Sequence, residues 1–400
     1  MGPGPIGKSK YPTVNAVDRI YLDHNATTPL DPAVRAAMEP YLGPAGNPSS
    51  IHAEGRRARA AVDNARDRIA ALLGVRPGEI VFTGGGTESN NLAIRGLARA
   101  GIARGRHLVT SATEHHAVLE TCEALQREGW EVTFLPVDAL GRTDPDQFEA
   151  ALRGDTVLAT VMTANNETGV CQPVAELAAR AARRGVRFHT DAVQSAGKER
   201  LPIGRGGSEG ITALSLTAHK FYGPLGAGLL FLRAGEPLER LTHGGSQENT
   251  RRPGTENVAA IVGLAEALAR AEAGREEEGP RQFALVERLW SALSDLPVAR
   301  RNGDPVGRIA NTLSVSFAGL EGEDLLIALD LAGLALSSGS ACLVGSVLPS
   351  HVLRAMGVPP EAARATVRFS LGKGTTEAEI DETVRRTREV VVRQAALVAG

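Results

Sequence analysis

The first residue that could do chemistry is a lysine that follows an apolar, strand-like run. Lys220 stands in the segment SLTAHKFYGP (residues 215–224), among small, polar and glycine residues. A lysine partly removed from water has a lowered pKa and can form a Schiff base with an aldehyde. Thr217 and His219 beside it could bind a phosphate. The alternative is a surface lysine in a turn, which is the usual place for this residue type.

A glycine-rich run, GGGTES at residues 84–89, lies between an apolar strand-like segment and an amphipathic helix. Glycines let backbone N–H groups approach an anion, and the start of a helix adds positive potential. A phosphate could therefore bind here, aided by the Thr87 hydroxyl. The spacing matches neither the dinucleotide fingerprint nor the Walker loop, which argues against dinucleotides and ATP. The alternative is a tight turn in which Thr87 caps the helix.

Asp191 ends a strand-like run that begins at residue 187. A carboxylate at the carboxyl end of a strand points into the crevice where α/β sheets bind ligands. There it could pair with a protonated pyridine nitrogen and make the ring a better electron sink. A helix cap or turn residue is the alternative role.

Alternating strands and helices must position these three sites. Strands are expected at residues 79–83, 107–111, 131–135, 156–163, 187–191, 211–216 and 227–232, and helices at 87–100, 117–128, 145–152 and 174–184 between them. The alternation predicts an α/β fold with a mostly parallel sheet covered by helices on both faces.

The chain beyond this region predicts a second, smaller unit. A helix over 258–275 runs into a charged stretch and then Gly279 and Pro280, which indicates a domain edge. Further helices are expected at 282–293, 350–356 and 377–396, and strands at 313–317, 334–336 and 365–370. We expect a large domain of residues 27–276 and a small α+β domain of residues 1–26 and 277–400.

The composition is that of an ordinary globular protein. The 400 residues are 42% hydrophobic and carry a formal net charge of −2, which favours neither nucleic acid nor an anionic membrane as partner. Cys122, Cys171 and Cys342 are far apart and odd in number, so a disulfide framework or a zinc site is not expected, and a reducing cytoplasm fits. The first ten residues contain no apolar core of a secretory signal, and no apolar run reaches the roughly 18 residues of a membrane span.

Taken together, these sites resemble the fold-type I enzymes that use pyridoxal 5'-phosphate (PLP), and within them the class V aminotransferase family. The resemblance narrows to the NifS/IscS-like cysteine desulfurases. The motifs that carry it run in family order: YLDHNATTP (21–29), GNPSS (46–50), TEH (113–115), NNETG (165–169), DAVQS (191–195), HK (219–220), RPGT (252–255), SSGSAC (337–342) and RFS (368–370). The implied fold has a seven-stranded, mostly parallel sheet in the large domain.

The resemblance implies roles at the cofactor. Lys220 would carry PLP as a Schiff base and later move the substrate Cα proton, and Asp191 would pair with the pyridine nitrogen. His115 would stack on the ring and act as an acid or base, although with His116 it could simply be a polar pair at a helix start. The other implied contacts are Asn166 and Gln194 to the phenolic oxygen, and Gly86, Thr87, Thr217 and His219 to the phosphate.

The resemblance also implies how substrate and subunits are bound. Arg368 would clamp the substrate carboxylate, a role suited to a guanidinium fork, with a structural ion pair as the alternative. Asn47 is expected to contribute to substrate binding. Thr255 would reach the phosphate of a neighbouring subunit, so we expect a homodimer. No metal site is expected, and whether Cys342 transiently ligates iron or an iron–sulfur cluster stays open.

Cys342 lies in a run of small residues ahead of Pro349 and a helix, which predicts a segment that can move. The thiolate is the nucleophilic form of cysteine. The implied reaction converts L-cysteine to L-alanine and leaves the sulfur as a persulfide on Cys342, from which an iron–sulfur scaffold protein or another acceptor takes it. Related enzymes usually have Thr-Ser after this cysteine; Leu343 and Val344 make the loop more apolar here and suggest a different acceptor.

Three other functions remain open. Selenocysteine lyase or cysteine sulfinate desulfinase chemistry on the same scaffold would need less from the Cys342 thiol. A sulfur-relay or scaffold protein without catalysis would not need PLP, which the presence of Lys220 and Asp191 argues against. An ordinary transaminase would need a keto acid and no Cys342.

Overall fold

A computed structural model of the chain describes residues 18–204, 206–338 and 349–399. Its largest sheet has seven strands in the order β2-β8-β7-β6-β5-β3-β4. The bounds are β2 Ile80–Thr83, β3 His107–Ser111, β4 Glu131–Leu135, β5 Thr156–Thr160, β6 Arg187–Asp191, β7 Ala213–Thr217 and β8 Gly228–Leu232. Strand β8 runs antiparallel to both neighbours, and the other pairs are parallel. The predicted mostly parallel, seven-stranded sheet is confirmed.

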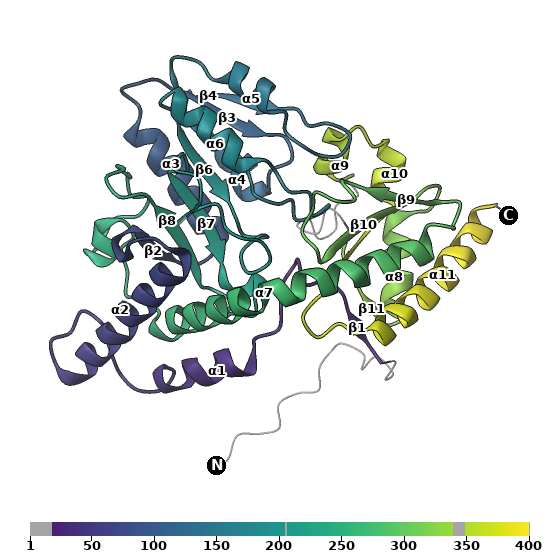
Figure 1. Ribbon diagram of the computed structural model, residues 1–400, viewed down its shortest axis with the longest axis horizontal. Helices are drawn as coiled ribbons and strands as arrows, with labels where there is room; N and C mark the ends of the chain where they lie inside the picture. Colours follow the sequence, from purple (N-terminus) through teal and green to yellow (C-terminus); the bar gives the residue numbers. More distant parts are fainter. Residues whose placement is uncertain (1–17, 205, 339–348, 400) are drawn as a thin grey trace, which may run out of the picture.

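Helices cover both faces of this sheet because its strands are apolar on both sides. Along β2, Ile80 and Phe82 face one core while Val81 faces the other, as the two-residue period of a strand requires. The helices are α1 Pro32–Met38, α2 Ala53–Leu73, α5 Pro145–Ala151, α6 Val174–Arg183 and the first part of α7 Val258–Leu293 on the first face, and α3 Gly86–Ala100 and α4 His116–Arg127 on the second. Figure 1 shows these helices on the faces of the sheet. A ligand is therefore expected at the carboxyl ends of the strands, where ligands of α/β sheets bind.

A second unit is built around an antiparallel sheet in the order β12-β10-β9. Its strands are β9 Ala299–Asn302, β10 Thr312–Phe317 and β12 Thr366–Ser370, and its helices are α8 Gly322–Leu331, α9 His351–Ala355, α10 Pro360–Arg364 and α11 Glu377–Ala399. Strand β1 (Ile20–Tyr21) pairs in parallel with β11 (Leu334–Ala335), which brings the start of the described chain into this unit. The short 3-10 helices η1 Glu39–Tyr41, η2 Pro77–Glu79, η3 Ala218–Lys220 and η4 Gln247–Thr250 complete the described elements.

The predicted helix break at Gly279 and Pro280 is wrong, because α7 is one helix of 36 residues that contains Pro280. An interior proline costs a helix about 3 kcal/mol. Burial at both ends offsets this cost: Leu264 contributes to the core of the large sheet and Leu289 to that of the second unit. Figure 1 shows α7 running along the large sheet and on into the second unit. We keep the division of the chain at residues 26/27 and 276/277 as a proposal, with α7 shared.

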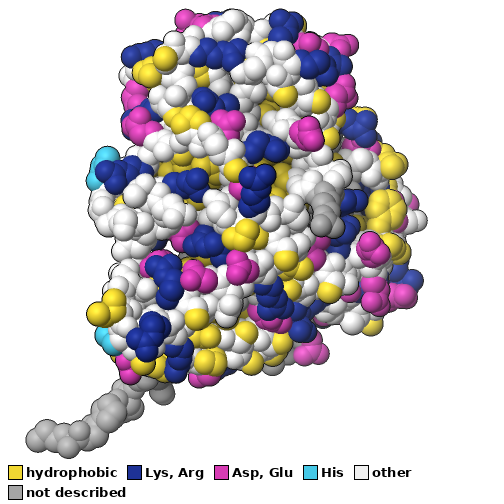
Figure 2. Space-filling model, turned by 60° about the vertical axis from the view of Figure 1, so that its left-hand side comes forward, with side chains coloured by type: hydrophobic (Ala, Val, Ile, Leu, Met, Phe, Trp, Pro, Cys, Tyr) yellow, Lys and Arg dark blue, Asp and Glu magenta, His cyan; other side chains and the backbone are white. Residues whose placement is uncertain are grey.

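The surface carries both signs of charge. On the face in Figure 2, Lys and Arg side chains are interspersed with Asp and Glu. None of the helices in the described ranges combines the length and the apolar character needed to cross a bilayer.

His189 gives the fold a pH dependence that can be measured. Its ring is 0% exposed in the centre of the sheet, between Thr160 and Ser215, and burial lowers its pKa to about 3. Below pH 6.5 the unfolded chain binds a proton that folded His189 refuses, so stability falls as the pH falls. We expect the free energy of unfolding in urea to drop by about 2 kcal/mol from this group between pH 7 and pH 5. His189→Gln should lose that part of the drop; an unchanged pH dependence in this variant would contradict the assignment.

Candidate active site

The predicted site residues follow the carboxyl ends of neighbouring strands. The glycine-rich loop follows β2, and His115 follows β3. Asn166 follows β5, Asp191 ends β6, and Lys220 lies in η3 just after β7. Strands β6 and β7 pair directly, with Asp191 opposite Ser215. Ligands of α/β sheets bind at the carboxyl ends of the strands, so the topology brings together side chains that lie far apart in the sequence.

The glycine-rich loop forms a cradle, meaning a hollow in the backbone whose glycines leave no room for a side chain. A Cβ on Gly86 would lie 2.7 Å from the Val193 Cγ2 atom, and one on Gly228 would lie 2.6 Å from the Gly85 backbone. Gly85 adopts a φ of 153° at the start of α3, a conformation available mainly to glycine. The cradle opens into a cavity of about 560 Å³, whose lining includes Thr87, Thr217 and His219. Backbone donors and hydroxyls around a helix start suit a phosphate.

Asp191 is held in place by two hydrogen bonds. The carboxylate is 6% exposed; the Asn90 Nδ2 atom donates to its Oδ2 at 2.6 Å, and the Val193 backbone N–H donates to its Oδ1 at 2.9 Å. These two donors orient the carboxylate at the strand end. Asn90, one turn into α3, was missed by the sequence analysis; its place four residues after Gly86 was the available signal.

Lys220 is partly buried, and its Nζ atom donates to the carbonyl oxygens of Asn25 at 2.5 Å and Ala26 at 2.7 Å. The His219 Nδ1 atom lies 3.1 Å from the Thr27 hydroxyl, and burial, followed by the charge of Lys220, lowers the pKa of His219 to about 4. A neutral His219 can accept or donate one hydrogen bond beside a phosphate.

His115 caps α4, since its Nδ1 atom accepts a hydrogen bond from the Ala117 N–H at 3.0 Å. The proton of the neutral ring must then sit on Nε2. Burial lowers the pKa of His115, and the charges of Lys220 and His116 act in the same direction, while Asp191 opposes them. The ring is therefore neutral near pH 7, with Nε2 as the atom that can exchange a proton.

Gln194 and Asn166 also lie close to Lys220 through shared partners. The Gln194 Nε2 atom donates at 3.0 Å to the Asn25 carbonyl, the same oxygen that Lys220 contacts. The Asn166 carbonyl accepts hydrogen bonds from Asn25 and Arg368. Asn25, which was missed as a site residue, thus links the candidate cofactor and substrate contacts.

Arg368 is only 2% exposed, and its guanidinium makes two polar contacts within the described residues. Its Nη2 atom pairs with the Asp23 Oδ1 atom at 2.8 Å, and its Nη1 atom donates to the Asn166 carbonyl at 2.9 Å. The buried Nε atom has no hydrogen-bond partner in the described chain. The structural ion pair considered above is therefore present, and a substrate carboxylate would have to share Arg368 with Asp23 or displace it.

We expect Arg368→Lys to raise the KM for the carboxylate substrate by about 10- to 100-fold, because a point charge cannot replace a guanidinium fork. Cofactor content should stay at the wild-type level, measured by absorbance. An unchanged KM would mean that Arg368 serves only the ion pair with Asp23.

Two predicted residues, Asn47 and Thr255, make no hydrogen bond or ion pair with the described residues of this site in the single chain, and a third lies outside the described residues. Asn47 is exposed, and its Oδ1 atom accepts from the Ser49 N–H in its own loop. Thr255 is exposed ahead of α7. Cys342, like Leu343 and Val344, lies outside the described residues.

The residues on either side of that segment contact the site. The Ser337 hydroxyl donates to the Asp23 Oδ2 atom at 3.3 Å, and the Ser350 hydroxyl donates to the Glu167 Oε2 atom. Asp23 pairs with Arg368, and Glu167 follows Asn166 directly. Both described ends of the Cys342 segment therefore start beside the candidate substrate contacts.

The chemistry of this site fits PLP. The Lys220 amine can bond to an aldehyde, the Asp191 carboxylate can pair with a pyridine nitrogen, and the glycine cradle can hold a phosphate. The fit rests on donors and acceptors that are already positioned by backbone and side-chain hydrogen bonds.

Comparisons with known proteins agree with this site. The family model described as Aminotransferase class-V matches residues 20–383. The chain is 46% identical to cysteine desulfurase IscS of Dictyoglomus turgidum over 91% of this chain and 92% of that protein, and 44% identical to cysteine desulfurase IscS of Methanosarcina thermophila over 93% and 92%. A solved structure of a NifS-like protein superposes with a TM-score of 0.88 at 36% identity, covering 94% of this chain and all of that one. A structure of SspA in complex with cysteine has a TM-score of 0.75 at 37% identity, covering 88% and 98%.

Proposed function

The chain belongs to the class-V aminotransferase family, and from this premise we propose that it is a PLP-dependent cysteine desulfurase. It would convert L-cysteine to L-alanine and retain the sulfur as a persulfide on Cys342. The observation that carries the proposal is the placement of the Lys220 amine and the Asp191 carboxylate at the ends of paired strands β7 and β6.

Bound PLP would supply an aldehyde that bonds to amines and a ring that accepts electrons. Gly86 and Thr87 on the cradle, with Thr217 and His219, would bind the phosphate. Asp191 would hold a proton on the pyridine nitrogen, and His115 would stack on the ring and exchange a proton through its Nε2 atom. Asn166 and Gln194 would contact the phenolic oxygen.

Arg368 would bind the substrate carboxylate and orient the Cα–H bond, and the Lys220 Nζ atom would take and return the Cα proton. The Cys342 thiolate would attack the substrate sulfur. A sulfur–sulfur bond forms while the Cβ–S bond breaks, and its electron pair stays with the three-carbon fragment, which takes up a proton and leaves as alanine. Atoms and electrons balance, since one thiol and one cysteine become one persulfide and one alanine.

Some features rest on the family resemblance alone. We propose a homodimer in which Thr255 reaches the phosphate of the neighbouring subunit, and we propose that Asn47 acts in substrate binding. We also propose an iron–sulfur scaffold as the sulfur acceptor, and the cytoplasm as the location.

The test is the release of sulfide and alanine from L-cysteine and a thiol reductant by PLP-loaded protein. Wild type should yield equal amounts of both products, and Cys342→Ala should retain PLP but fall below about 1% of the wild-type rate, since the nucleophile is gone. Cys171→Ala is the matched control: burial raises the pKa of this thiol to about 12, so it is no nucleophile at neutral pH and its loss should leave the rate unchanged.

Other outcomes would select other functions. Activity retained in Cys342→Ala would favour a selenocysteine lyase or cysteine sulfinate desulfinase. A wild-type protein that refuses PLP and stays colourless would favour a sulfur-relay or scaffold protein without catalysis.

A further inference from the structure

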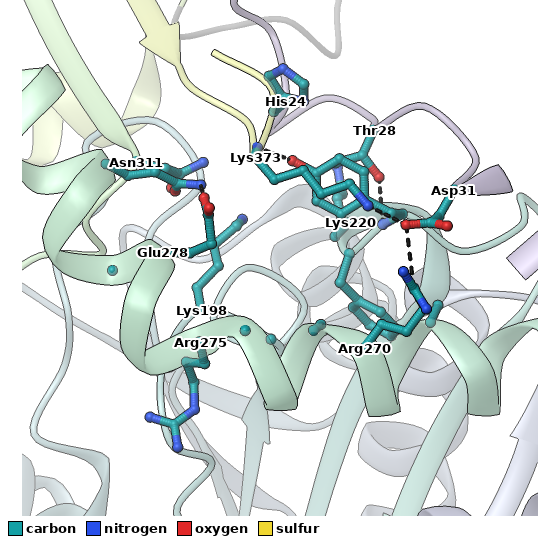
Figure 3. Close-up of a pocket in the computed structure, with 18 of the residues that line it drawn as sticks. His24, Thr28, Asp31, Lys198, Lys220, Arg270, Arg275, Glu278, Asn311 and Lys373 are labelled. Atoms are coloured by element: carbon teal, nitrogen blue, oxygen red, sulfur yellow. Dashed lines mark hydrogen bonds and ion pairs between the residues drawn. The ribbon is translucent and has the colours of Figure 1, made fainter. Parts of the chain in front are cut away.

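A cavity of about 300 Å³ reaches Lys220 from the side of α7. Figure 3 shows Lys198, Lys220, His24 and Lys373 around it. Lys220 is the lysine of the proposed reaction, and Lys373 pairs with Asp31, which also lies 3.5 Å from Arg270. Of the other two, Lys198 contacts Gln194, a predicted site residue.

Lys198 is joined to Lys220 through two intermediate groups. The Lys198 Nζ atom donates to the Gln194 Oε1 atom at 3.2 Å, four residues earlier in the chain. The other end of this carboxamide, Nε2, donates to the Asn25 carbonyl at 3.0 Å. The same carbonyl accepts from the Lys220 Nζ atom at 2.5 Å.

This arrangement defines the orientation of the Gln194 carboxamide. A backbone carbonyl can only accept, so the Nε2 end must face Asn25. The Oε1 end then accepts from Lys198, whose amine carries N–H donors in either protonation state. Gln194 is buried. If its carboxamide were turned by 180°, the NH₂ group would face the Lys198 amine and the oxygen would face the Asn25 carbonyl, and both hydrogen bonds would be lost.

We infer that Lys198 is a positioning residue, which holds Gln194 so that its NH₂ group faces Lys220 and the phenolic oxygen of bound PLP. The inference rests on the proposed function for the presence of PLP. It assigns Lys198 no direct contact with substrate or cofactor.

The electrostatic surroundings of Lys198 are consistent with close coupling to the site. Burial, followed by the charges of Lys220 and Arg368, lowers the pKa of Lys198 to about 7, while Glu199 opposes them. The other titratable or charged groups that line the cavity are His24, Asp31, Tyr222, Arg270, Arg275, Glu277, Glu278 and Lys373.

The experiment is a pH titration of the absorbance of PLP bound to the full chain. A donor at the phenolic oxygen stabilises the form that has lost the proton shared with the Lys220 nitrogen. Lys198→Met, and Lys198→Leu as a second removal variant, should therefore raise the midpoint by about one pH unit. Lys198→Arg, which retains a cationic donor, should restore the wild-type midpoint.

Two comparisons separate positioning from other effects. Lys373→Met is the matched control, since it removes a lysine from the same cavity that pairs with Asp31 instead of Gln194; its midpoint should equal that of wild type. In a Gln194→Ala background, Lys198→Met should cause no further shift, because the group through which it acts is already gone.

A wild-type midpoint in both removal variants would overturn the inference, and so would a shift that persists in the Gln194→Ala background, since that result would mean the charge of Lys198 acts directly. The titration needs no turnover of cysteine. If the wild-type chain bound PLP but released no alanine, the proposed function would be refuted, and the absorbance titration could still test the role of Lys198.

Discussion

Replacing Lys220 by alanine should lower the turnover of L-cysteine by about 10⁴-fold or more, since it removes both the covalent attachment to PLP and the group that moves the Cα proton. The neighbouring imidazoles cannot form a Schiff base, and they are held by other contacts: His219 lies against Thr27, and His115 caps α4 through its Nδ1 atom. The loss should appear in kcat, measured as alanine formed per subunit.

The same variant should bind PLP without a covalent bond. After borohydride reduction, mass spectrometry of wild type should find the cofactor on the peptide that contains Lys220, and Lys220→Ala should carry none. Lys373→Ala is the matched control, because this lysine lines the same cavity but pairs with Asp31. A small amine added to Lys220→Ala should restore part of the rate; full activity without it would exclude Lys220 from the chemistry.

Asp191→Asn should lower kcat by about 10³-fold while leaving the protein folded and coloured. A neutral amide cannot hold a proton on the pyridine nitrogen, so the ring becomes a weaker electron acceptor. The amide also fits poorly between its two neighbours, because the Asn90 Nδ2 atom and the Val193 N–H both require an acceptor. Stopped-flow absorbance would separate slow chemistry from slow binding.

A graded series makes this prediction sharper. Asn90→Ala removes one of the two donors and should cost about 10-fold, less than the loss of the carboxylate itself. Asp144→Asn is the control, since this side chain caps α5 and asparagine caps a helix equally well. If Asp191→Asn matched wild type in kcat, the ring nitrogen would not need the carboxylate.

The regular part of the fold could be predicted because most strands of the large sheet are short, largely apolar runs bounded by turns, and most alternate with helices. The seven predicted strands, from residues 79–83 to residues 227–232, correspond to the seven found. Strand β9 was missed because its sequence, ARRN, is polar and pairs only at the sheet edge. Helix α8 and helix α10 were missed as well. The continuity of α7 through Pro280 could not be predicted, because it depends on two cores that form far apart in the sequence.

The candidate site likewise contains residues that could be predicted from the sequence and residues that could not. Asp191 and Lys220 were predictable because strand ends meet at one edge of a parallel sheet. The role of Asn25 was not, since its carbonyl meets Lys220 across 195 positions of sequence and no local pattern encodes that contact. Lys198 was missed for a related reason. A lysine four residues after a glutamine resembles a solvent-facing pair on a turn, and only the folded chain shows that Lys198 is partly buried and contacts Gln194.

The pairing of β1 with β11 has a consequence for biosynthesis. Ile20 contacts its partner Leu334 only after roughly 300 further residues have been made, which takes the ribosome about 15 to 60 s. During this time the strands of the large sheet are complete and can fold, whereas Ile20 and Leu22 still lack the apolar neighbours that will bury them. Strand β1 is therefore synthesised early but is among the last of the described strands to pair. The Leu22 carbonyl also accepts from the Ser370 N–H at the end of β12, at 2.8 Å. Newly made chains should therefore remain open to proteases and chaperones near residue 20 until synthesis has passed β12.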